Sequence, residues 1–488
     1  MAHVDQLDDA AADQARDRAR ARARAGSRGY WLLVGLIVMV AFGKAILADT
    51  MDPDAFWHLR VADQLIADGI RPLVDQISFA SIKTPWTPYS WLAELFMRDV
   101  WNLGGYHAAT AVTALCSAGI VVFTARACRA RTTNLFASLL CTVAAAWLTL
   151  PFVSFRPVTF ALLLFAIIID LLARPSKRGI WLIPPIVLLM TNLHLYAGLC
   201  AIAVTLVAVA SWWDDRGQFV RNALLALLTL AAACGTPMIA GTIATALRYN
   251  GDDPMVAANY ITEMRPFWWG VGGKVSLGIV IGCALLLLTS QKKHSVADWL
   301  LVAIATALLF RLGRFAPVFA ILALPRIARL MPAMDVRVIR KPLIQFAVAG
   351  VLGFGVFNLC LQYPRQMTLD DWLNRNGDNY PTAAARFVDE RVLPMQGRII
   401  NEFNWGGYLA WRLGDRYQVL MDGRTQLYTP DFWRATHLGN EASRTALLTT
   451  IDADAAILPA DQSAFMPALV SLGWREVYRD KLAVVMTR

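Results

Sequence analysis

Residues 30–48 read YWLLVGLIVMVAFGKAILA, and this stretch decides the fold class of the chain. Its only charged residue is Lys44. A helix of this length spans the roughly 30 Å hydrocarbon core of a bilayer. We therefore expect a membrane-spanning helix here, and because some thirty polar residues precede it, a cleavable signal peptide is not indicated.

Similar apolar segments recur along most of the chain. With 57% hydrophobic and 17% charged residues, the composition excludes an ordinary soluble or disordered protein of 488 residues. Together with the first, ten further segments predict a polytopic α-helical membrane protein with about 11 spans. They are 106–126, 134–153, 157–173, 180–191, 194–213, 221–239, 274–290, 297–310, 315–331 and 342–361.

The net charge of +10 is informative through its distribution. Residues 1–29 form an Arg-rich tail, and alternate loops between the spans are also basic, such as the one with Arg126, Arg129 and Arg131. The positive-inside rule places the tail and these loops in the cytoplasm, so the charge indicates topology and not nucleic-acid binding. The domains expected are thus a cytoplasmic tail 1–29, a transmembrane domain 30–362 with a long first outer loop 49–105, and an extracytoplasmic segment 363–488.

The segment 363–488 is polar and predicts a separate α/β domain. Short β-rich runs at 398–401, 417–421, 455–458 and 482–486 alternate with helical patterns at 381–391, 441–450 and 463–472. The seven cysteines lie in or beside apolar runs, without disulfide or zinc-ligand spacing.

The densest polar chemistry follows the first span, where Asp49, Asp52, Asp54 and His58 lie within ten residues. Pro53 suits the first turn of a helix that Asp52 can cap, and His58 then lies one turn beyond Asp54. Asp52 and Asp54 are candidate ligands of a divalent cation (Mg or Mn) or general bases for an acceptor hydroxyl, with His58 as a catalytic partner. The alternative is simple N-capping and solvation.

The rest of the first loop alternates aromatic and acidic residues. Trp57, Trp91 and Glu94 are candidate substrate-binding residues, because such side chains can wall a cavity for an isoprenoid or a sugar ring. Alternatively, the tryptophans are interfacial anchors. Two amphipathic stretches predict that this loop lies flat on the outer leaflet.

Charged residues also lie at the outward ends of later spans. Arg156, Arg311 and Arg314 do not serve the positive-inside bias, and a guanidinium is a good bidentate ligand for phosphate. His194 and Glu263 are further candidates for substrate contact. The alternatives are snorkelling of the arginines and a surface pair of Glu263 with Arg265 or Arg248.

In the C-terminal segment, Asp422 and Arg424 follow a predicted strand in the run Met421-Asp-Gly-Arg-Thr425. Glycine lets the backbone approach a ligand, so Asp422 and Arg424 are candidate contacts for sugar hydroxyls or phosphate. Ordinary Asp-Gly turn chemistry is the alternative.

Taken together, nine motifs resemble a family of bacterial polytopic proteins grouped with the C-type glycosyltransferase superfamily, whose members resemble dolichyl-phosphate-mannose mannosyltransferases. The motifs are DPDAFWHL (52–59), PLVDQISF (72–79), SWLAEL (90–95), SFRP (154–157), NLH (192–194), ITEMRPF (261–267), RLGRFAP (311–317), NEFNWGGYL (401–409) and MDGRTQLY (421–428). The run MTNLHLYAG (190–198) departs from the WANLHG-like run of this family because it lacks the tryptophan and the first glycine.

The resemblance implies an enzyme of the bacterial inner membrane that takes a sugar from a polyprenyl-phosphate donor at the outer face. Asp52 or Asp54 matches its acidic first-loop motif. The leading hypothesis is therefore an inverting glycosyltransferase whose partners are that donor, an envelope glycan or lipid acceptor and membrane lipids. A lipid or glycan transporter (flippase) and a non-catalytic envelope glycan-binding protein are the alternatives. A transporter would carry polar residues through both halves of the membrane.

Overall fold

The computed structural model describes residues 2–48, 51–174, 176, 178–248, 254–332, 334, 337–363, 368, 371, 380–392, 396–461 and 463–488. Asp49 of the acidic motif lies outside these residues, as do most positions of the expected domain boundary between 364 and 379.

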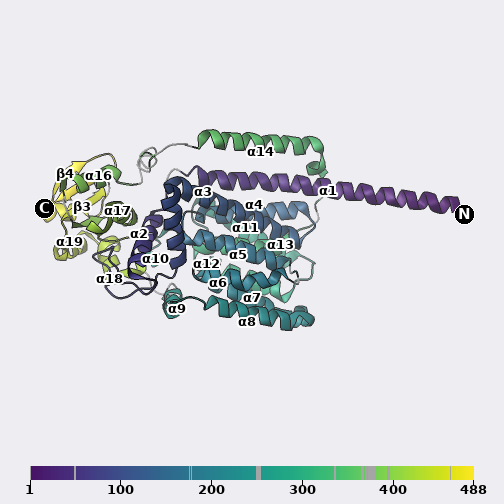
Figure 1. Ribbon diagram of the computed structural model, residues 1–488, viewed down its shortest axis with the longest axis horizontal. Coiled ribbons are helices and arrows are strands. Elements are labelled where there is room, and N and C mark those ends of the chain that lie inside the picture. Colours follow the sequence, from purple (N-terminus) through teal and green to yellow (C-terminus); the bar gives the residue numbers. More distant parts are fainter. Residues whose placement is uncertain are drawn as a thin grey trace.

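Each of the eleven predicted apolar segments forms a helix, and most of these helices run side by side in one bundle (Figure 1). They are α1 (Ala2–Ile46), α3 (Trp91–Arg131), α4 (Leu135–Thr149), α5 (Pro157–Ala173), α6 (Ile183–Thr191), α7 (Tyr196–Asp214), α8 (Phe219–Ala233), α11 (Gly270–Thr289), α12 (Val296–Arg311), α13 (Ala316–Leu330) and α14 (Pro342–Gln362). Within the described chain, six are long and apolar enough to cross a membrane: α1 from Arg24, α3, α4 with its extension to Phe152, α7, α11 and α14. The expected helical fold with membrane-type helices is confirmed in this form.

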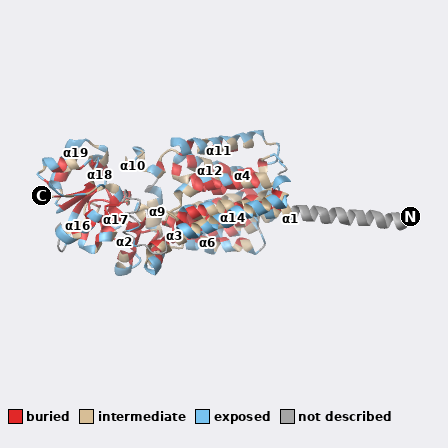
Figure 2. Ribbon diagram, turned by 90° about the horizontal axis from the view of Figure 1, so that it is seen from above, coloured by how far each residue is buried: buried red, intermediate tan, exposed pale blue. Residues whose placement is uncertain are grey.

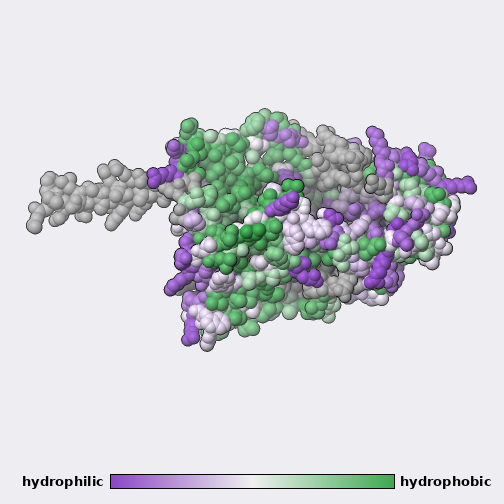
Figure 3. Space-filling model, turned by 180° about the vertical axis from the view of Figure 1, so that it is seen from behind, coloured by the Kyte–Doolittle hydropathy of each residue, from purple (hydrophilic) through white to green (hydrophobic). Residues whose placement is uncertain are grey.

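The surface of the bundle fits a lipid environment. Hydrophobic residues cover its flank, whereas hydrophilic residues gather on the C-terminal unit and along the opposite edge of the bundle (Figure 3). The outermost helix, α14, exposes large apolar side chains such as Leu343, Phe346 and Phe354. These surfaces are compatible with a multi-pass membrane protein.

Helix α13 is buried along almost its whole length and packs against α3, α4 and α12. It is apolar on all sides in its first two turns, as is typical of a helix surrounded by other helices. The 3-10 turn η5 (Gly313–Phe315) precedes it and carries Arg314. The end of the central helix therefore fixes the position of this arginine.

The C-terminal unit contains a five-stranded sheet in the order β2-β1-β3-β5-β4. Its strands are β1 (Gly397–Asn401), β2 (Tyr417–Val419), β3 (Ala455–Pro459), β4 (Arg475–Arg479) and β5 (Ala483–Thr487). Strand β1 is parallel to β2 and β3, while β5 is antiparallel to β3 and β4. The helices are α16 (Thr382–Phe387), α17 (Gly406–Leu413), α18 (Pro430–Trp433), α19 (Glu441–Thr450) and α20 (Met466–Ser471). The sheet confirms the expected strands, while β4, α17 and α18 were not predicted.

The first loop packs against this C-terminal unit. Its helix α2 (Pro53–Asp68) lies against α17, and the ring of Phe56 contacts those of Tyr380 and Tyr408 at centroid distances of 5.3 and 5.2 Å. Residues 77–79 run parallel to β2: Val419 N donates to Ile77 O at 3.1 Å, and Phe79 N donates to Val419 O at 3.0 Å. The loop extends the edge of the sheet and shares a buried core with residues of the C-terminal unit. Helix α2 lies beside α17 in Figure 2.

Two short helices, α9 (Ile239–Arg248) and α10 (Pro254–Ala257), lie in the segment between α8 and α11. This segment also contains the 3-10 turn η4 (Thr262–Met264), which carries Glu263. In Figure 1, α2, α9 and α10 lie between the bundle and the sheet. Segments that are far apart in the sequence therefore meet in this middle layer.

Candidate functional site

A polar cavity of about 320 Å³ lies in this middle layer, and we call it the central cavity. The bundle, the first loop and the C-terminal unit all contribute to its lining. Eight of the predicted site residues line it: Asp52, Asp54, Trp57, His58, Arg156, His194, Glu263 and Arg314. Five others do not: Trp91, Glu94, Arg311, Asp422 and Arg424.

The start of α2 places the two aspartates in the cavity. As predicted, Asp52 is the N-cap and Pro53 the first helical residue, and Asp54 N donates to Asp52 Oδ1 at 3.0 Å. Ser154 Oγ donates to the other oxygen of Asp52, Oδ2, at 2.9 Å. Both oxygens of Asp52 are thus engaged in holding α2 and the 154–157 turn together.

Arg156 is the centre of the charged cluster. Its side chain is 16% exposed and pairs with three carboxylates: Nη2 lies 2.7 Å from Asp54 Oδ2, and Nη1 lies 3.4 Å from Asp52 Oδ2 and 3.1 Å from Glu263 Oε2. Against the effect of burial, these three negative charges raise the pKa of Arg156 well above its usual range. The guanidinium is therefore a permanent positive charge in the cavity.

Asp54 has the environment of a general base. One oxygen pairs with Arg156, and the other accepts a hydrogen bond of 2.9 Å from Trp57 Nε1. Burial raises the pKa of Asp54 to about 6, with the nearby charges of Asp52 and Glu263 acting in the same direction and Arg156 against it. A carboxylate with such a pKa is ionised at neutral pH and accepts a proton more readily than an ordinary aspartate.

Glu263 joins two arginines. It accepts two hydrogen bonds from Arg156, and its Oε1 lies 3.8 Å from Arg314 Nη2. Although burial raises it, the two guanidinium groups lower the pKa of Glu263 to about 2, so it is ionised. A Cβ atom at Gly313 would lie 2.1 Å from Arg265 O. Only glycine therefore lets η5 approach the segment of η4 closely enough for Arg314 to reach Glu263.

The alternative expectation was a surface pair of Glu263 with Arg265 or Arg248. Glu263 instead pairs with Arg156 and Arg314. Arg265 Nε instead donates to Asn259 O at 2.8 Å. The side chain of Arg248 lies outside the described part of the chain.

Two neutral histidines border the cavity. Burial, and after it Arg156, holds the pKa of His58 well below its usual range, while burial and Arg314 lower the pKa of His194 to about 3. Because His194 Nδ1 accepts from Tyr196 N at 3.2 Å, the proton of the neutral ring lies on Nε2. The neutral ring of His194 can thus donate a hydrogen bond from Nε2.

Glu94 and Trp91 lie behind the cavity wall. Glu94 is fully buried, with Oε1 at 3.2 Å from His58 Nδ1 and accepting from Ser90 Oγ at 2.9 Å. Trp91 Nε1 donates to Asn192 Oδ1 at 3.0 Å. Both side chains thus hydrogen-bond to neighbouring protein groups. Neither lines the central cavity, where we expected them to contact a substrate. Arg311 lies on the exposed end of α12, away from the cavity.

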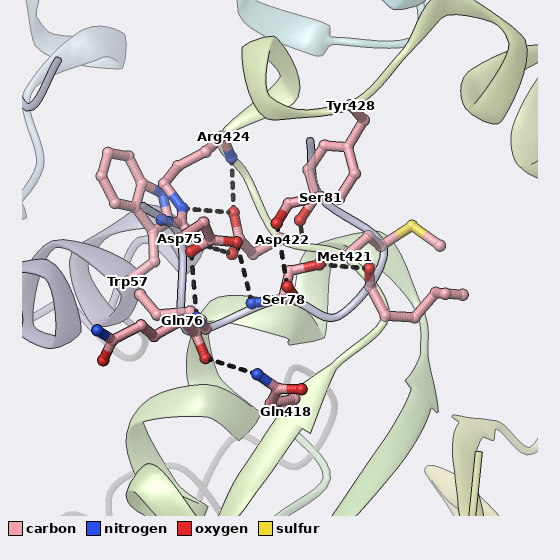
Figure 4. Close-up of polar contacts among 12 residues, drawn as sticks. Trp57, Asp75, Gln76, Ser78, Ser81, Gln418, Met421, Asp422, Arg424 and Tyr428 are labelled. Atoms are coloured by element: carbon pink, nitrogen blue, oxygen red, sulfur yellow. Dashed lines mark hydrogen bonds and ion pairs between the residues drawn. The ribbon is translucent and has the colours of Figure 1, made fainter. Parts of the chain in front are cut away.

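Asp422 and Arg424 form a buried latch with Asp75 of the first loop (Figure 4). Arg424 Nη2 lies 2.8 Å from Asp75 Oδ1 and 2.5 Å from Asp422 Oδ2, and the side chains of Arg424 and Asp75 are both 0% exposed. Because these side chains are fully buried, they have no surface free for the predicted contact with a sugar or phosphate. They instead join the first loop to the C-terminal unit. The intervening Gly423 lies against the site: a Cβ there would meet Asp54 Oδ1 at 2.1 Å.

Several lining residues were not predicted. They are Tyr89, Tyr260, Thr262, Asn404, Thr425 and Gln426, and Ser154 holds Asp52 from the side. Ser154, Thr262, Asn404, Thr425 and Gln426 belong to motifs noted for their charged members. Because their side chains are uncharged, nothing in the sequence singles them out within these motifs.

The donor set fits a guanidinium better than a divalent cation. The three carboxylates of Asp52, Asp54 and Glu263 are all paired with Arg156, which supplies the positive charge between them. Among the described residues, no group of three or more His, Cys, Asp or Glu side chains is arranged to hold a metal ion. We therefore assign no step to a metal at Asp52 and Asp54.

The fold and cavity define a class: a helical protein with membrane-type helices and a charged cavity beneath an α/β unit. Comparison with models of known protein families finds no match, and a search of curated proteins finds no relative.

Proposed function

We propose that the protein is an inverting membrane glycosyltransferase that moves a sugar from a polyprenyl-phosphate donor to a cell-envelope acceptor. The observation that carries this proposal is the bridge of Glu263 between Arg156 and Arg314, beside the raised pKa of Asp54. A carboxylate held by two guanidinium groups occupies the place that a phosphate of the donor would take. The base lies within the same cavity.

A second cavity of about 410 Å³ supports a lipid-linked donor. It shares Thr262 and Glu263 with the central cavity, and apart from Arg265 and Ser276 its other lining residues are apolar or glycine. Trp147 and Trp269, 47% and 51% exposed, lie in its lining, so it opens on the apolar flank of the bundle. An amphiphile with an isoprenoid chain in this groove would present its phosphate to the two arginines.

The chemistry assigned to these residues is a single displacement. The oxygen of the acceptor hydroxyl attacks C1 of the donor sugar and forms the new C1–O bond, while the bond from C1 to the phosphate oxygen breaks. The electron pair leaves with polyprenyl phosphate, whose charge Arg156 and Arg314 stabilise. Asp54 takes the hydroxyl proton. Attack opposite to the leaving group inverts the anomeric configuration.

The proposed topology has eleven spans in the bacterial inner membrane, with the N-terminus in the cytoplasm and residues 363–488 outside. Hydrophilic residues along the edge of the bundle opposite the C-terminal unit support it (Figure 3). The central cavity lies at the end of the bundle next to the C-terminal unit, as an enzyme of the outer face requires.

The test is a transfer assay with purified protein in lipid, labelled polyprenyl-phosphate sugars and envelope acceptors. We expect sugar release from at least one donor by the wild-type protein and a product of inverted configuration by NMR. The Asp54→Asn variant should retain donor binding and lose turnover. The proposal fails if no donor is cleaved, or if Asp54→Asn keeps full activity.

A further inference from the structure

A third cavity, of about 470 Å³, adjoins the central cavity, and we call it the side cavity. Met264, Thr425 and Gln426 line both cavities, so the two meet at these residues. The first loop contributes residues 82 and 84–87, the α9–α10 segment another wall, and residues 425–433 of the C-terminal unit a third. Its volume lies within the roughly 300–1,000 Å³ of small-molecule sites.

The chemistry of the side cavity differs from that of its neighbour. Trp86, Tyr428 and Trp433 give it aromatic rings, and several threonines and Gln426 give it neutral hydrogen-bonding groups. No charged side chain lines it within the described ranges, whereas three carboxylates and two arginines line the central cavity. Trp86 Nε1 is buried and has no hydrogen-bond partner among the described residues.

We infer that the side cavity binds an uncharged sugar unit of the acceptor, an inference that rests on the proposed glycosyl transfer. Aromatic rings offer flat apolar faces to the C–H surface of a sugar, and threonine and glutamine groups pair with its hydroxyls. Among the described residues that line it, a charged ligand would find no counter-ion, which is costly for a buried charge. Because the two cavities meet at Gln426, a sugar in the side cavity would lie next to the cavity that Asp54 lines.

Helix α9 offers a blocking variant with a matched control. Ala244 and Ala246 are both exposed alanines on α9, but only Ala244 lines the side cavity. A phenylalanine at position 244 fills the space, whereas the same change at 246 does not. Gln426→Leu replaces the amide side chain by an apolar one of nearly the same volume, so it tests the contribution of hydrogen bonding separately.

The experiment measures saturation-transfer NMR of the full-length protein in nanodiscs. The neutral probes are methyl α-mannoside and methyl β-glucoside, and methyl β-glucuronide is the anionic probe. We expect a signal from at least one neutral glycoside with the wild type and Ala246→Phe, a fall of at least fivefold with Ala244→Phe and with Gln426→Leu, and no glucuronide signal that Ala244→Phe lowers. The inference is overturned if no neutral glycoside binds, if Ala244→Phe binds as well as Ala246→Phe, or if Ala244→Phe lowers the glucuronide signal as much as that of the neutral glycosides.

Donor cleavage by water, measured in parallel, separates this inference from the proposed function. Cleavage without glycoside binding at the side cavity overturns only the acceptor site. Glycoside binding that responds to Ala244→Phe, without cleavage of any donor, overturns only the glycosyl transfer.

Discussion

Arg156 and Glu263 lie 107 positions apart in the chain and form a two-pronged contact, with Nη1 at 3.1 Å from Oε2 and Nη2 at 3.4 Å from Oε1. Arg156 is the N-cap of α5 and Glu263 belongs to η4, so the contact joins two turns of the bundle at the site. Planar pairing of this kind depends on the guanidinium fork and cannot be reproduced by an ammonium group.

Arg156→Lys should therefore impair catalysis strongly. Lysine keeps the charge but loses the fork that holds Asp54 and Glu263 together, so we expect donor cleavage to fall by about 10²–10³-fold. The measurement is kcat/KM for donor hydrolysis in nanodiscs. Arg311→Lys, at the exposed end of α12, is the control and should keep wild-type activity. Equal activities of the two variants would contradict the role of Arg156.

A matched pair of substitutions should show different effects on activity for Asp52 and Asp54. Asp54→Asn removes the proposed base, and we expect turnover to fall by about 10²–10⁴-fold. Asp52→Asn keeps an N-cap of similar quality, so it should change thermal stability little and activity much less than Asp54→Asn. Turnover and thermal unfolding are measured together, and a larger activity loss in Asp52→Asn would reverse the assignment.

The rate should depend on pH through Asp54. Because the base must be deprotonated and its pKa is about 6, kcat/KM should fall with unit slope below about pH 6 and level off above it. Glu263→Gln removes a negative neighbour that raises this pKa, so the acid limb should move to lower pH. A limb that stays in place in Glu263→Gln would show that another group is titrating.

The sequence predicted the bundle well because apolar periodicity and length are local signals. All eleven segments form helices, and the cap of α2 by Asp52 is as expected from the Asp-Pro-Asp run. Eight of the candidate residues line one cavity: Arg156, Glu263 and Arg314 lie at turns of the bundle, and the first two turns of α2 with its cap bring Asp52, Asp54, Trp57 and His58 beside them. Charged residues near helix ends were therefore the sequence signal that predicted most of the site.

What could not be predicted depends on contacts between distant segments. Ser78 pairs with Val419 across more than three hundred residues, so the docking of the first loop leaves no local pattern. Edge strand β4, Arg475–Arg479, is mostly exposed and lacks apolar alternation. The Asp-Gly-Arg turn at 422–424 resembles a ligand loop until Asp75 is placed beside it.

Breaking the latch should destabilise the docking of the first loop. Arg424→Met leaves Asp75 and Asp422 buried without their partner, and loss of one member of such a buried pair costs about 3–5 kcal/mol. We expect a lower unfolding temperature and new protease cleavage within residues 69–90. Arg434→Ala, which breaks an exposed pair with Asp431, is the control and should change neither. An unchanged cleavage pattern in Arg424→Met would contradict the latch.

Gly423→Ala should damage the site while leaving the latch intact. Its Cβ would lie 2.1 Å from Asp54 Oδ1 and 3.0 Å from Trp57 Nε1, so the base and its hydrogen-bond donor must move. Because misplacement by about 1 Å can cost 10²-fold in rate, we expect a loss of that order in donor cleavage. Gly350→Ala, where a Cβ meets no atom within 4 Å in α14, is the matched control and should retain activity. Full activity of Gly423→Ala would show that Asp54 does not need its observed position, and the role of Asp54 as base would then have to be abandoned.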